Sequence, residues 1–468
     1  MNEWRLIRDP IYNYVAYNKE IEKKILDTRP MQRLRWLRQL QMSHMVYPGA
    51  DHTRFQHSLG TMHLAGLFAE KLLSKLEKEQ LEGFSQKELV ETARIAGLLH
   101  DIGHGPFSHA FEEAIFMTRK NLKIRNHEVA GYYITQYSEI GEILDRNGLL
   151  DSVLSLLSSE KPSKKILRLI RKTVKEWIYP ADILDFLNRD SYYTGTREYG
   201  SVDYYRLINL SHPMPSDIEE IVLEERARGA LASYLKSRLA MFENVYFHPV
   251  STVFNKMVAD IMRLTDDETN VYSNAIDLLA EGDPSKYLEL TDYEAIRLGI
   301  EHADENQVLQ ALIQDLLSRR PAWKLIVERK YVIKPSDLSG PATLLLKPET
   351  YRSLVESIEQ IIYQHLQDKG MEDYSGLWVT LNALKPVPPI PSGYVYFGKN
   401  VGGQLIVENK VNIPKLLEEE GILFKLIIRV YAPRKLRETN DLWEKYRKTI
   451  SKILEKELQP FGLGEVTM

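Results

Sequence analysis

Residues 96–109 have the sequence AGLLHDIGHGPFSH, in which an apolar run meets a cluster of histidines and one aspartate. The chain is apolar nearly all round from Ala93 to Leu99, and the glycines and proline that follow predict a buried helix ending in a sharp turn. The adjacent pair His100 and Asp101 stands at that helix end. Burying an aspartate beside histidines is costly unless its charge is compensated, and a divalent cation compensates it directly. The stretch therefore indicates a metal site.

Histidine is concentrated around this stretch, because eight of the 12 histidines fall between His44 and His127. The chain has no cysteine, which excludes disulfides and thiolate nucleophiles and leaves nitrogen and oxygen as metal ligands. A mixed His/Asp set suits Mn²⁺, Fe²⁺, Co²⁺, Ni²⁺ or Zn²⁺ better than Ca²⁺ or Mg²⁺, which prefer all-oxygen shells. The alternative is a hydrogen-bonded His–Asp core pair or a helix cap. The length of the fragment and the upstream His57 favour the metal.

The surrounding sequence has a helical pattern from Lys19 to about residue 275. Residues 54–76 carry apolar side chains at three- and four-residue spacing, as a helix with one buried face should. We expect further helical segments over 126–138, 163–191 and 217–263.

After about residue 310 the pattern changes to runs of strand length with β-branched and aromatic residues. The expected strands are 323–333, 377–384, 394–397 paired with 405–407 as a hairpin, and 423–430, accompanied by helices at 349–368 and 440–457. The proline-rich segment 385–393 is interpreted as an internal loop. The fold class predicted is mainly α, with a helical bundle domain over 1–310 and a smaller α+β domain over 311–468 that serves assembly or regulation.

Composition limits the class of protein further. Hydrophobic residues make up 44% and charged residues 27% of 468 residues, as in globular proteins. The net charge of −4 argues against wholesale electrostatic attraction to nucleic acid. No stretch approaches the roughly 20 uninterrupted apolar residues of a membrane span, and no signal-peptide run opens the chain, so we expect a cytoplasmic protein without a membrane partner.

Six fragments in order carry a resemblance to a known family. They are DPIYNYV (9–15), QRLRWLRQL (32–40), YPGADHTRFQHSLG (47–60), AGLLHDIGHGPFSH (96–109), NHEVAG (126–131) and DILDFLNRD (182–190). The chain resembles the HD-domain phosphohydrolases over about residues 5–310. The most similar subgroup is the deoxynucleoside triphosphate triphosphohydrolases, which include the vertebrate restriction factor with a SAM and an HD domain. No SAM domain is expected here.

The resemblance implies a set of functional residues at the matching positions. The metal ligands would be His57, His100, Asp101 and Asp182. A second layer that protonates the leaving oxygen and binds phosphate would consist of His104, His109, Glu112 and His127, with His127 and Glu112 as a plausible acid pair. The substrate-binding positions would be Gln39, Leu40, Arg54, Phe186, Asp190, Arg238 and Tyr246.

Individual roles in substrate binding also follow from the resemblance. Gln39 and Leu40 would contact the deoxyribose, where Leu40 leaves little room for a 2′-hydroxyl, and Asp190 would contact the sugar hydroxyl. Arg54 and Arg238 would bind phosphate. Tyr246 would contact the base or sugar.

The chain departs from the family pattern next to the last proposed ligand. The triphosphate hydrolases commonly place a lysine directly after that aspartate and a tyrosine four residues after it, whereas this chain has Ile183 and Phe186. Two polar contacts to a substrate are therefore missing, which weakens the case for a 5′-triphosphate more than the case for a metal.

The activity implied is hydrolysis of deoxynucleoside triphosphates at the α-phosphorus, releasing nucleoside and inorganic triphosphate, with one divalent transition metal per site and Mg²⁺ accompanying the nucleotide as a further option. The resemblance also implies a homo-oligomer, dimer or tetramer, activated by a nucleotide effector. Two alternatives stay open. One is an HD-type phosphatase or phosphodiesterase acting on nucleotide monophosphates or cyclic nucleotides, and the other is a non-catalytic nucleotide- or nucleic-acid-binding protein.

The run 161–177, KPSKKILRLIRKTVKEW, concentrates seven lysines and arginines among apolar residues at helical spacing. An amphipathic helix with a solvated basic face is the favoured interpretation. The other interpretation is contact with the phosphates of a nucleotide effector or of single-stranded nucleic acid.

Overall fold

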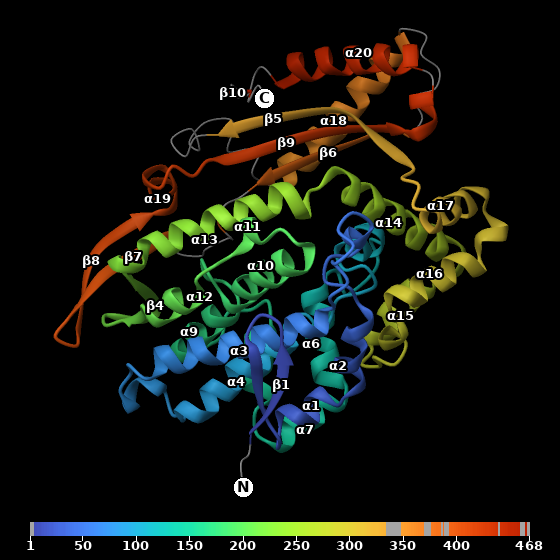
Figure 1. Ribbon diagram of the computed structural model, residues 1–468. Coiled ribbons are helices and arrows are strands. Elements are labelled where there is room, and N and C mark those ends of the chain that lie inside the picture. Colours follow the sequence, from blue (N-terminus) through green and yellow to red (C-terminus); the bar gives the residue numbers. More distant parts are fainter. Residues whose placement is uncertain are drawn as a thin grey trace.

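The computed structural model describes residues 4–333, 348–368, 376–384, 387, 393–438, 440–458 and 464–465. Most of the chain forms a helical body, and the C-terminal third adds sheets and two long helices along one side of it (Figure 1). This arrangement confirms the mainly α fold with a smaller α+β part. No helix among the described residues is long and apolar enough to cross a membrane.

Three helices form the centre of the body: α3 (Arg54–Leu73), α4 (Gln86–Leu99) and α10 (Ala181–Thr194). Capping boxes begin α3 at Thr53 and α4 at Ser85, satisfying the free amides of the first turn. Glycines bring the helices close together. A Cβ at Gly97 would lie 2.9 Å from the Thr61 carbonyl oxygen, and a Cβ at Gly60 would overlap the Asp185 carboxylate at 1.8 Å. Close packing around these glycines places the polar ends of the three helices together.

The remaining helices of the body surround these three. They are α1 (Glu22–Leu26), α2 (Arg29–Arg33), α5 (His109–Phe111), α6 (His127–Tyr137), α7 (Glu139–Arg146), α8 (Leu150–Leu157), α9 (Lys165–Val174), α11 (Arg197–Gly200), α12 (Tyr204–Asn209), α13 (Arg228–Met241), α14 (Pro249–Thr269), α15 (Val271–Ala280), α16 (Asp292–Glu301) and α17 (Gln307–Leu317). Two π-helical turns, η4 (Glu112–Phe116) and η6 (Phe242–Tyr246), continue α5 and α13.

Two of the helical segments expected from the sequence are wrong in part. Residues 163–191 form α9 and α10 with a break over 175–180, where Lys175 is extended, Glu176 has φ of 67° and Pro180 caps α10. The expected helix over 217–263 begins instead with strand β4 (Asp217–Glu224), which pairs with β3 (Ser211–Met214). Tertiary pairing overrides the helical preference of its glutamates there. An antiparallel hairpin, β1 (Trp4–Asp9) with β2 (Asn13–Asn18), precedes the helices.

The C-terminal strands follow the sequence prediction. β5 (Trp323–Ile333), β6 (Trp378–Leu384), β9 (Phe424–Pro433) and β10 (Gly464–Glu465) form an antiparallel sheet in the order β10-β5-β9-β6. α18 (Pro348–Asp368) and α20 (Asn440–Leu458) lie along the outer side of this sheet, and α14 lies below it (Figure 1). The predicted hairpin is β7 (Tyr394–Val401) with β8 (Gln404–Asn412), followed by α19 (Ile413–Glu419). Most of the predicted loop 385–393 lies outside the described residues.

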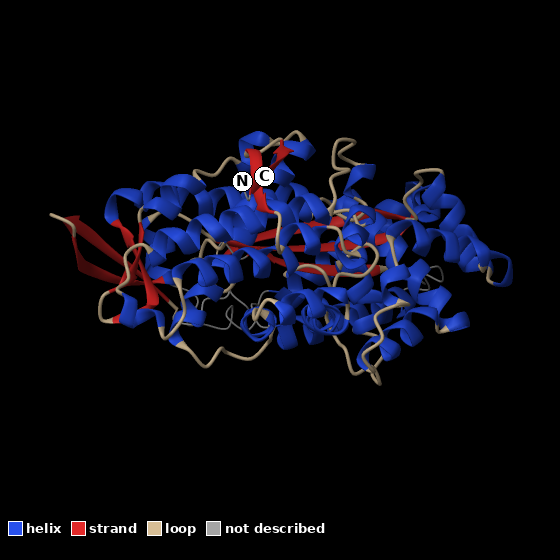
Figure 2. Ribbon diagram, turned by 90° about the horizontal axis from the view of Figure 1, so that it is seen from below, coloured by secondary structure: helices blue, strands red, loops and turns tan. Residues whose placement is uncertain are grey.

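The second sheet connects the two parts of the chain. Its order is β3-β4-β7-β8, and β4 of the body pairs in parallel with β7 of the C-terminal part. Figure 2 shows this sheet at one end of the elongated molecule. The pairing crosses residue 310, where the sequence predicts a boundary, so the division into 1–310 and 311–468 stays a prediction.

The basic run 161–177 lies against the acidic strand β4. Arg168 pairs with Glu219, and Lys172 Nζ lies 3.0 Å from Glu220 Oε2. These ion pairs neutralise part of the run within the molecule, which favours the interpretation as an amphipathic helix over contact with external phosphates.

Candidate active site

Three helix ends bring the four predicted metal ligands together. His57 lies in the second turn of α3, His100 caps the C-terminus of α4 and is followed by Asp101, and Asp182 lies in the first turn of α10. His57 Nε2 lies 3.2 Å from His100 Nε2, 3.1 Å from Asp182 Oδ1 and 3.6 Å from Asp101 Oδ2. His100 Nε2 lies 3.5 Å from Asp182 Oδ1. His57, His100 and Asp101 therefore form a group with metal-ligand spacing, and Asp182 lies beside the two histidines of that group.

The hydrogen bonds of the two imidazoles fit a cation at this point. His57 Nδ1 lies 2.8 Å from Asp185 Oδ2, and His100 Nδ1 lies 2.8 Å from the Gly97 carbonyl oxygen. Both partners accept hydrogen bonds, so each Nδ1 carries the hydrogen and each Nε2 presents its lone pair to the other. Two lone pairs at 3.2 Å need a positive group between them, either a proton or a metal ion.

The carboxylates of the cluster are ionised. Burial would raise the pKa of Asp101, but the charges of His100, Arg54 and His104 outweigh it and hold the pKa well below its usual range. Burial would likewise raise the pKa of Asp182, and the hydrogen bonds with His100 and His57 lower it instead. Burial lowers the pKa of His57, yet its hydrogen bonds with Asp182 and Asp185 raise it to about 10. A metal ion that binds here displaces that proton.

The predicted second layer adjoins the ligands. Glu112, on the π-helical turn η4, bridges two histidines: its Oε2 lies 3.0 Å from His109 Nδ1 and its Oε1 lies 2.5 Å from His127 Nδ1. The His127 ring stacks on His104 with centroids 3.8 Å apart. His104 Nε2 lies 3.4 Å from Asp101 Oδ1, which joins this histidine cluster to the proposed ligands. π-helical turns often occur at functional sites.

The two stacked imidazoles have opposite protonation tendencies. Burial lowers the pKa of His104 well below its ordinary value, and the nearby charges of Arg54 and His127 lower it further. Burial would also lower the pKa of His127, but the hydrogen bond and charge of Glu112 outweigh it and raise the pKa. Of these two stacked rings, His127 is therefore the one whose protonated form is favoured.

Strained backbone marks the turn between these two groups. Phe107 and Ser108 both have φ of 52°, the left-handed region that non-glycine residues rarely adopt. Ser108 Oγ accepts a hydrogen bond of 2.8 Å from Arg54 Nε, and Arg54 Nη1 pairs with Asp101. Asp292 Oδ1 accepts the Phe107 amide at 2.7 Å. These contacts hold the turn and place the predicted phosphate ligand Arg54 beside Asp101.

The structure also brings together the predicted substrate-binding residues of α10, α13 and η6. Tyr246 donates a hydrogen bond of 2.8 Å to Asp190 Oδ2, and the Phe186 ring lies 5.9 Å from that of Tyr246 and 6.4 Å from that of His57. Arg238 is nine-tenths buried, with its guanidinium 4.5 Å from the Phe242 ring centroid. Its Nε has no hydrogen-bond partner, and no carboxylate of the described residues lies within ion-pair distance of it.

Gln39 and Leu40 lie on the loop before α3. The Gln39 amide donates to the His52 carbonyl oxygen at 3.0 Å, and His52 Nε2 lies 2.8 Å from Asp190 Oδ1. The buried Gln39 Oε1 has no partner among the described residues, and Leu40 is buried. The loop thus reaches the Asp190 side of the site through His52.

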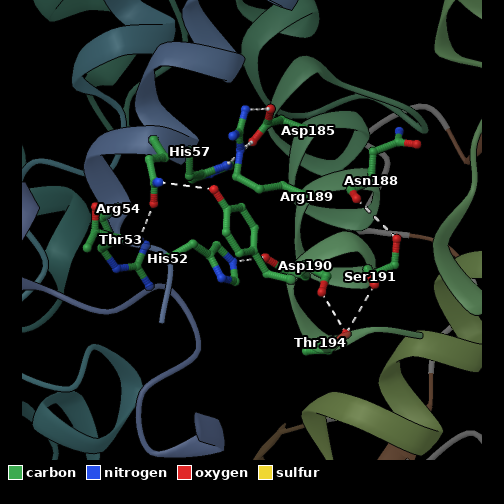
Figure 3. Close-up of polar contacts among 12 residues, drawn as sticks. His52, Thr53, Arg54, His57, Asp185, Asn188, Arg189, Asp190, Ser191 and Thr194 are labelled. Atoms are coloured by element: carbon green, nitrogen blue, oxygen red, sulfur yellow. Dashed lines mark hydrogen bonds and ion pairs between the residues drawn. The ribbon is translucent and has the colours of Figure 1, made fainter. Parts of the chain in front are cut away.

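The sequence analysis missed the residues that support the ligands. Asp185 and Arg189 lie one and two turns after Asp182 on α10, and Asp185 contacts His57 directly (Figure 3). His52, which holds Asp190, was also missed. The signal was present in DILDFLNRD, where aspartates and an arginine recur at three- and four-residue spacing on one helix.

Comparison with known proteins gives matches over the same region. The HD domain family matches residues 54–200, which contain all four proposed ligands. An uncharacterized protein of Bacillus subtilis is 30% identical over 59% of this chain and 60% of its own length. An uncharacterized protein of Methanocaldococcus jannaschii is 32% identical over 97% of this chain and 84% of its own length.

A relative with lower identity has a name that states an activity. The protein named deoxynucleoside triphosphate triphosphohydrolase SAMHD1 in Bos taurus is 28% identical over 58% of this chain and 49% of its own length, so the match spans about half of that protein.

Solved structures agree on the fold. A hypothetical protein from Aquifex aeolicus superposes with a TM-score of 0.66 at 23% identity, covering 95% of this chain and 99% of its own. A phosphohydrolase from Bacteroides thetaiotaomicron superposes with a TM-score of 0.65 at 22% identity, covering 92% and 100%. The resemblance inferred from the six sequence fragments is confirmed. With the His/Asp cluster at its centre, the chain belongs to the HD-domain family of metal-dependent phosphohydrolases.

Proposed function

We propose that the protein hydrolyses deoxynucleoside triphosphates to deoxynucleoside and inorganic triphosphate. The observation that carries the proposal is the buried Arg238, whose Nε has no hydrogen-bond partner and which forms no ion pair among the described residues. Burial lowers the pKa of Arg238, and its neighbours Tyr234, Tyr246 and Asp182 raise it only in part. A buried cation without an anion is costly, and a polyphosphate supplies the missing partner. The name of the Bos taurus relative points to the same substrate class.

In this proposal His57, His100, Asp101 and Asp182 hold one divalent transition metal, drawn from Mn²⁺, Fe²⁺, Co²⁺, Ni²⁺ and Zn²⁺. The ion, when bound, supplies Lewis acidity toward water and a phosphoryl oxygen. The donor set matches this group of ions, because two imidazole lone pairs and two ionised carboxylates face one point.

The second layer moves the proton. His127, kept protonated by Glu112, donates its proton to the 5′-oxygen that leaves with the nucleoside. His104 and His109 bind phosphate oxygens beside it, and the Arg54 guanidinium stabilises the charge that develops there.

The sugar and base contact the opposite side. Asp190 accepts hydrogen bonds from His52 and Tyr246, and this ordered carboxylate is proposed to accept the sugar hydroxyl as well. Gln39 and Leu40 border the deoxyribose, and Leu40 excludes a 2′-hydroxyl. Phe186 and Tyr246 offer ring faces to the nucleoside.

A second candidate follows from Ile183 and Phe186, which offer no polar group to a triphosphate. This candidate is a phosphatase or phosphodiesterase acting on nucleotide monophosphates or cyclic nucleotides at the same metal centre. We also propose a dimer or tetramer activated by a nucleotide effector, with the C-terminal part serving assembly.

A nucleotide panel with product identification tests the proposal. The purified full chain, loaded in turn with each of the five metals and with Mg²⁺ present, is incubated with deoxynucleotides, ribonucleotides and cyclic nucleotides, singly and as mixtures. Phosphorus NMR identifies the products. Inorganic triphosphate from deoxynucleotides alone supports the proposal. Orthophosphate or an opened cyclic nucleotide supports the second candidate, and binding without turnover under every condition supports a non-catalytic protein. Light scattering of the same mixtures measures assembly.

A further inference from the structure

A chain of buried charged residues runs from the N-terminal hairpin to the proposed ligand His57. Asp185 Oδ2 lies 2.8 Å from His57 Nδ1. Arg189 donates hydrogen bonds to both carboxylate oxygens of Asp185, from Nε to Oδ2 at 2.9 Å and from Nη2 to Oδ1 at 2.9 Å. The third nitrogen of Arg189, Nη1, lies 2.8 Å from Asp9 Oδ2 at the end of β1. Figure 3 shows His57 on α3 facing Asp185 and Arg189 on α10.

The charges along this chain alternate and are shielded from solvent. The side chains of Asp185 and Arg189 are fully buried, and that of Asp9 is 5% exposed. Asp185 accepts two hydrogen bonds from Arg189, so its oxygens act as acceptors and His57 Nδ1 is the donor that faces them. With Nδ1 held by Asp185, His57 Nε2 points toward Asp182 and His100, where it can bind a metal ion once its own proton has left.

The hairpin supports Asp185 in a second way. Tyr12, in the turn between β1 and β2, donates a hydrogen bond of 2.8 Å to Asp185 Oδ1. Asp9 Oδ1 accepts the backbone amides of Ile11 and Tyr12 at 2.8 and 3.0 Å, which fixes the turn while Oδ2 holds Arg189. The carboxylate that orients His57 is thus held by groups from the first residues of the chain.

We propose that Asp185 is a positioning residue for His57, and that Asp9, Tyr12 and Arg189 make the hairpin 4–18 part of the metal centre. The inference rests on the ligand set given under the proposed function, and it is independent of the substrate. Partners behind a metal-binding histidine typically change metal affinity by about 10–100-fold. Replacing Asp185 should therefore weaken metal binding, although Asp185, Arg189, Asp9 and Tyr12 do not themselves touch the metal.

Three variants separate the steps. In Asp185→Asn the amide loses one acceptor and turns a donor toward Arg189 or His57. Asp9→Asn retains the oxygen that caps the turn and loses the anion opposite Arg189. Tyr12→Phe removes only the hydroxyl. A matched control is Glu22→Gln, which breaks the buried ion pair between Glu22 and Arg94 beside the same hairpin without contacting Asp185.

The measurement is the Kd for Zn²⁺ and for Mn²⁺, each determined by competition with a fluorescent chelator on the full chain, together with thermal unfolding of the metal-free protein. We expect a 10–100-fold higher Kd for Asp185→Asn, a smaller several-fold rise for Asp9→Asn and Tyr12→Phe, and no change for Glu22→Gln even where it lowers the unfolding temperature. If Asp185→Asn fails to fold, Asp9→Asn and Tyr12→Phe carry the same test.

Two outcomes overturn the inference in different ways. The inference is wrong if the folded variants Asp185→Asn, Asp9→Asn and Tyr12→Phe bind the metal with a Kd within twofold of wild type. It is also wrong if Glu22→Gln raises the Kd as much as they do. In either case these charged residues only stabilise the fold. His57→Ala identifies the other failure: if it leaves the Kd unchanged, the ligand set itself is wrong and the inference fails with it. Because no nucleotide is present, neither result depends on the substrate.

Discussion

The metal side and the substrate side of the site differ in how far the chain satisfies its own polar groups. On the metal side, His57 Nδ1 and His100 Nδ1 are held by Asp185 and by the Gly97 carbonyl oxygen, which orients both Nε2 atoms toward one point. The neighbouring His104 Nδ1 has no partner among the described residues. On the substrate side, Gln39 Oε1, His52 Nδ1 and Arg238 Nε are buried without a partner among the described residues. A buried polar group left unpaired costs about 1–3 kcal/mol. The metal side is thus organised before anything binds, whereas the substrate side has polar groups that a ligand must complete.

Removing a proposed ligand should break the metal side altogether. His57→Ala or Asp101→Ala should lose the bound metal and lower kcat by at least about a thousandfold, since a catalytic metal contributes several kcal/mol. Elemental analysis and phosphate release assays measure the two effects. His302→Ala, a histidine remote from the cluster in the sequence, serves as the control and should retain both metal and activity. Full activity in metal-free His57→Ala would contradict the account.

Removing the unpaired cation should damage the substrate side and spare the metal. Arg238→Ala should raise KM for the triphosphate by roughly 10–100-fold, the equivalent of one charge-assisted hydrogen bond, with metal content unchanged. Arg238→Lys should recover part of the loss. Steady-state kinetics with parallel elemental analysis measures both. A variant that loses its metal, or one that retains the wild-type KM, would remove the distinction between the two sides.

The pair of Glu112 and His127 connects the two sides through a proton. Glu112 raises the pKa of His127, and a general acid acts only while protonated, so activity should fall as pH rises through that pKa. Glu112→Gln lowers the pKa of His127, and the basic limb of the pH–rate profile should move to lower pH. The rate above the new limb should drop about tenfold, less than the roughly 10²–10⁴ that complete loss of general acid catalysis would cost. The neighbouring Glu113→Gln should leave the limb in place, and a shift equal to that of Glu112→Gln would refute the assignment.

The smallest expected effect sharpens the substrate side. Phe186→Tyr restores the hydroxyl that the triphosphate hydrolases commonly have at this position. If the substrate is a 5′-triphosphate, KM should fall by roughly fivefold, the value of one neutral hydrogen bond of about 1 kcal/mol. Competition kinetics between a deoxynucleoside triphosphate and its monophosphate measures the preference. An improvement for the monophosphate alone would favour the second candidate function.

Local sequence was enough to predict the His100 and Asp101 pair and the C-terminal strands, whereas most other proposed site residues came from the family resemblance. His100 and Asp101 lie at one helix end. Strands β5 and β9 could be predicted because their length and their β-branched and aromatic residues are visible within each segment alone. The interpretation failed where distant partners decide the structure. Strand β4 forms because β3 and β7 pair with it, against the preference of its own residues.

The support of the ligands was hidden for the same reason. Asp185 meets His57 across 128 positions of sequence, and Arg189 meets Asp9 across 180. No periodicity within one segment reports such contacts. The helical spacing of Asp182, Asp185 and Arg189 shows only that they share a helix, and the fold determines which of them faces the metal and which faces the hairpin.

Anomalous diffraction from crystals of the metal-loaded full chain, collected at the absorption edge of the metal, tests the central claim most directly. The account predicts one peak within about 2.0–2.3 Å of His57 Nε2, of His100 Nε2 and of a carboxylate oxygen from Asp101 and from Asp182. The neighbouring group of Asp101, His104 and His127 also has a spacing able to hold a metal. A single peak among those three residues, or no peak in metal-loaded crystals, would contradict the account.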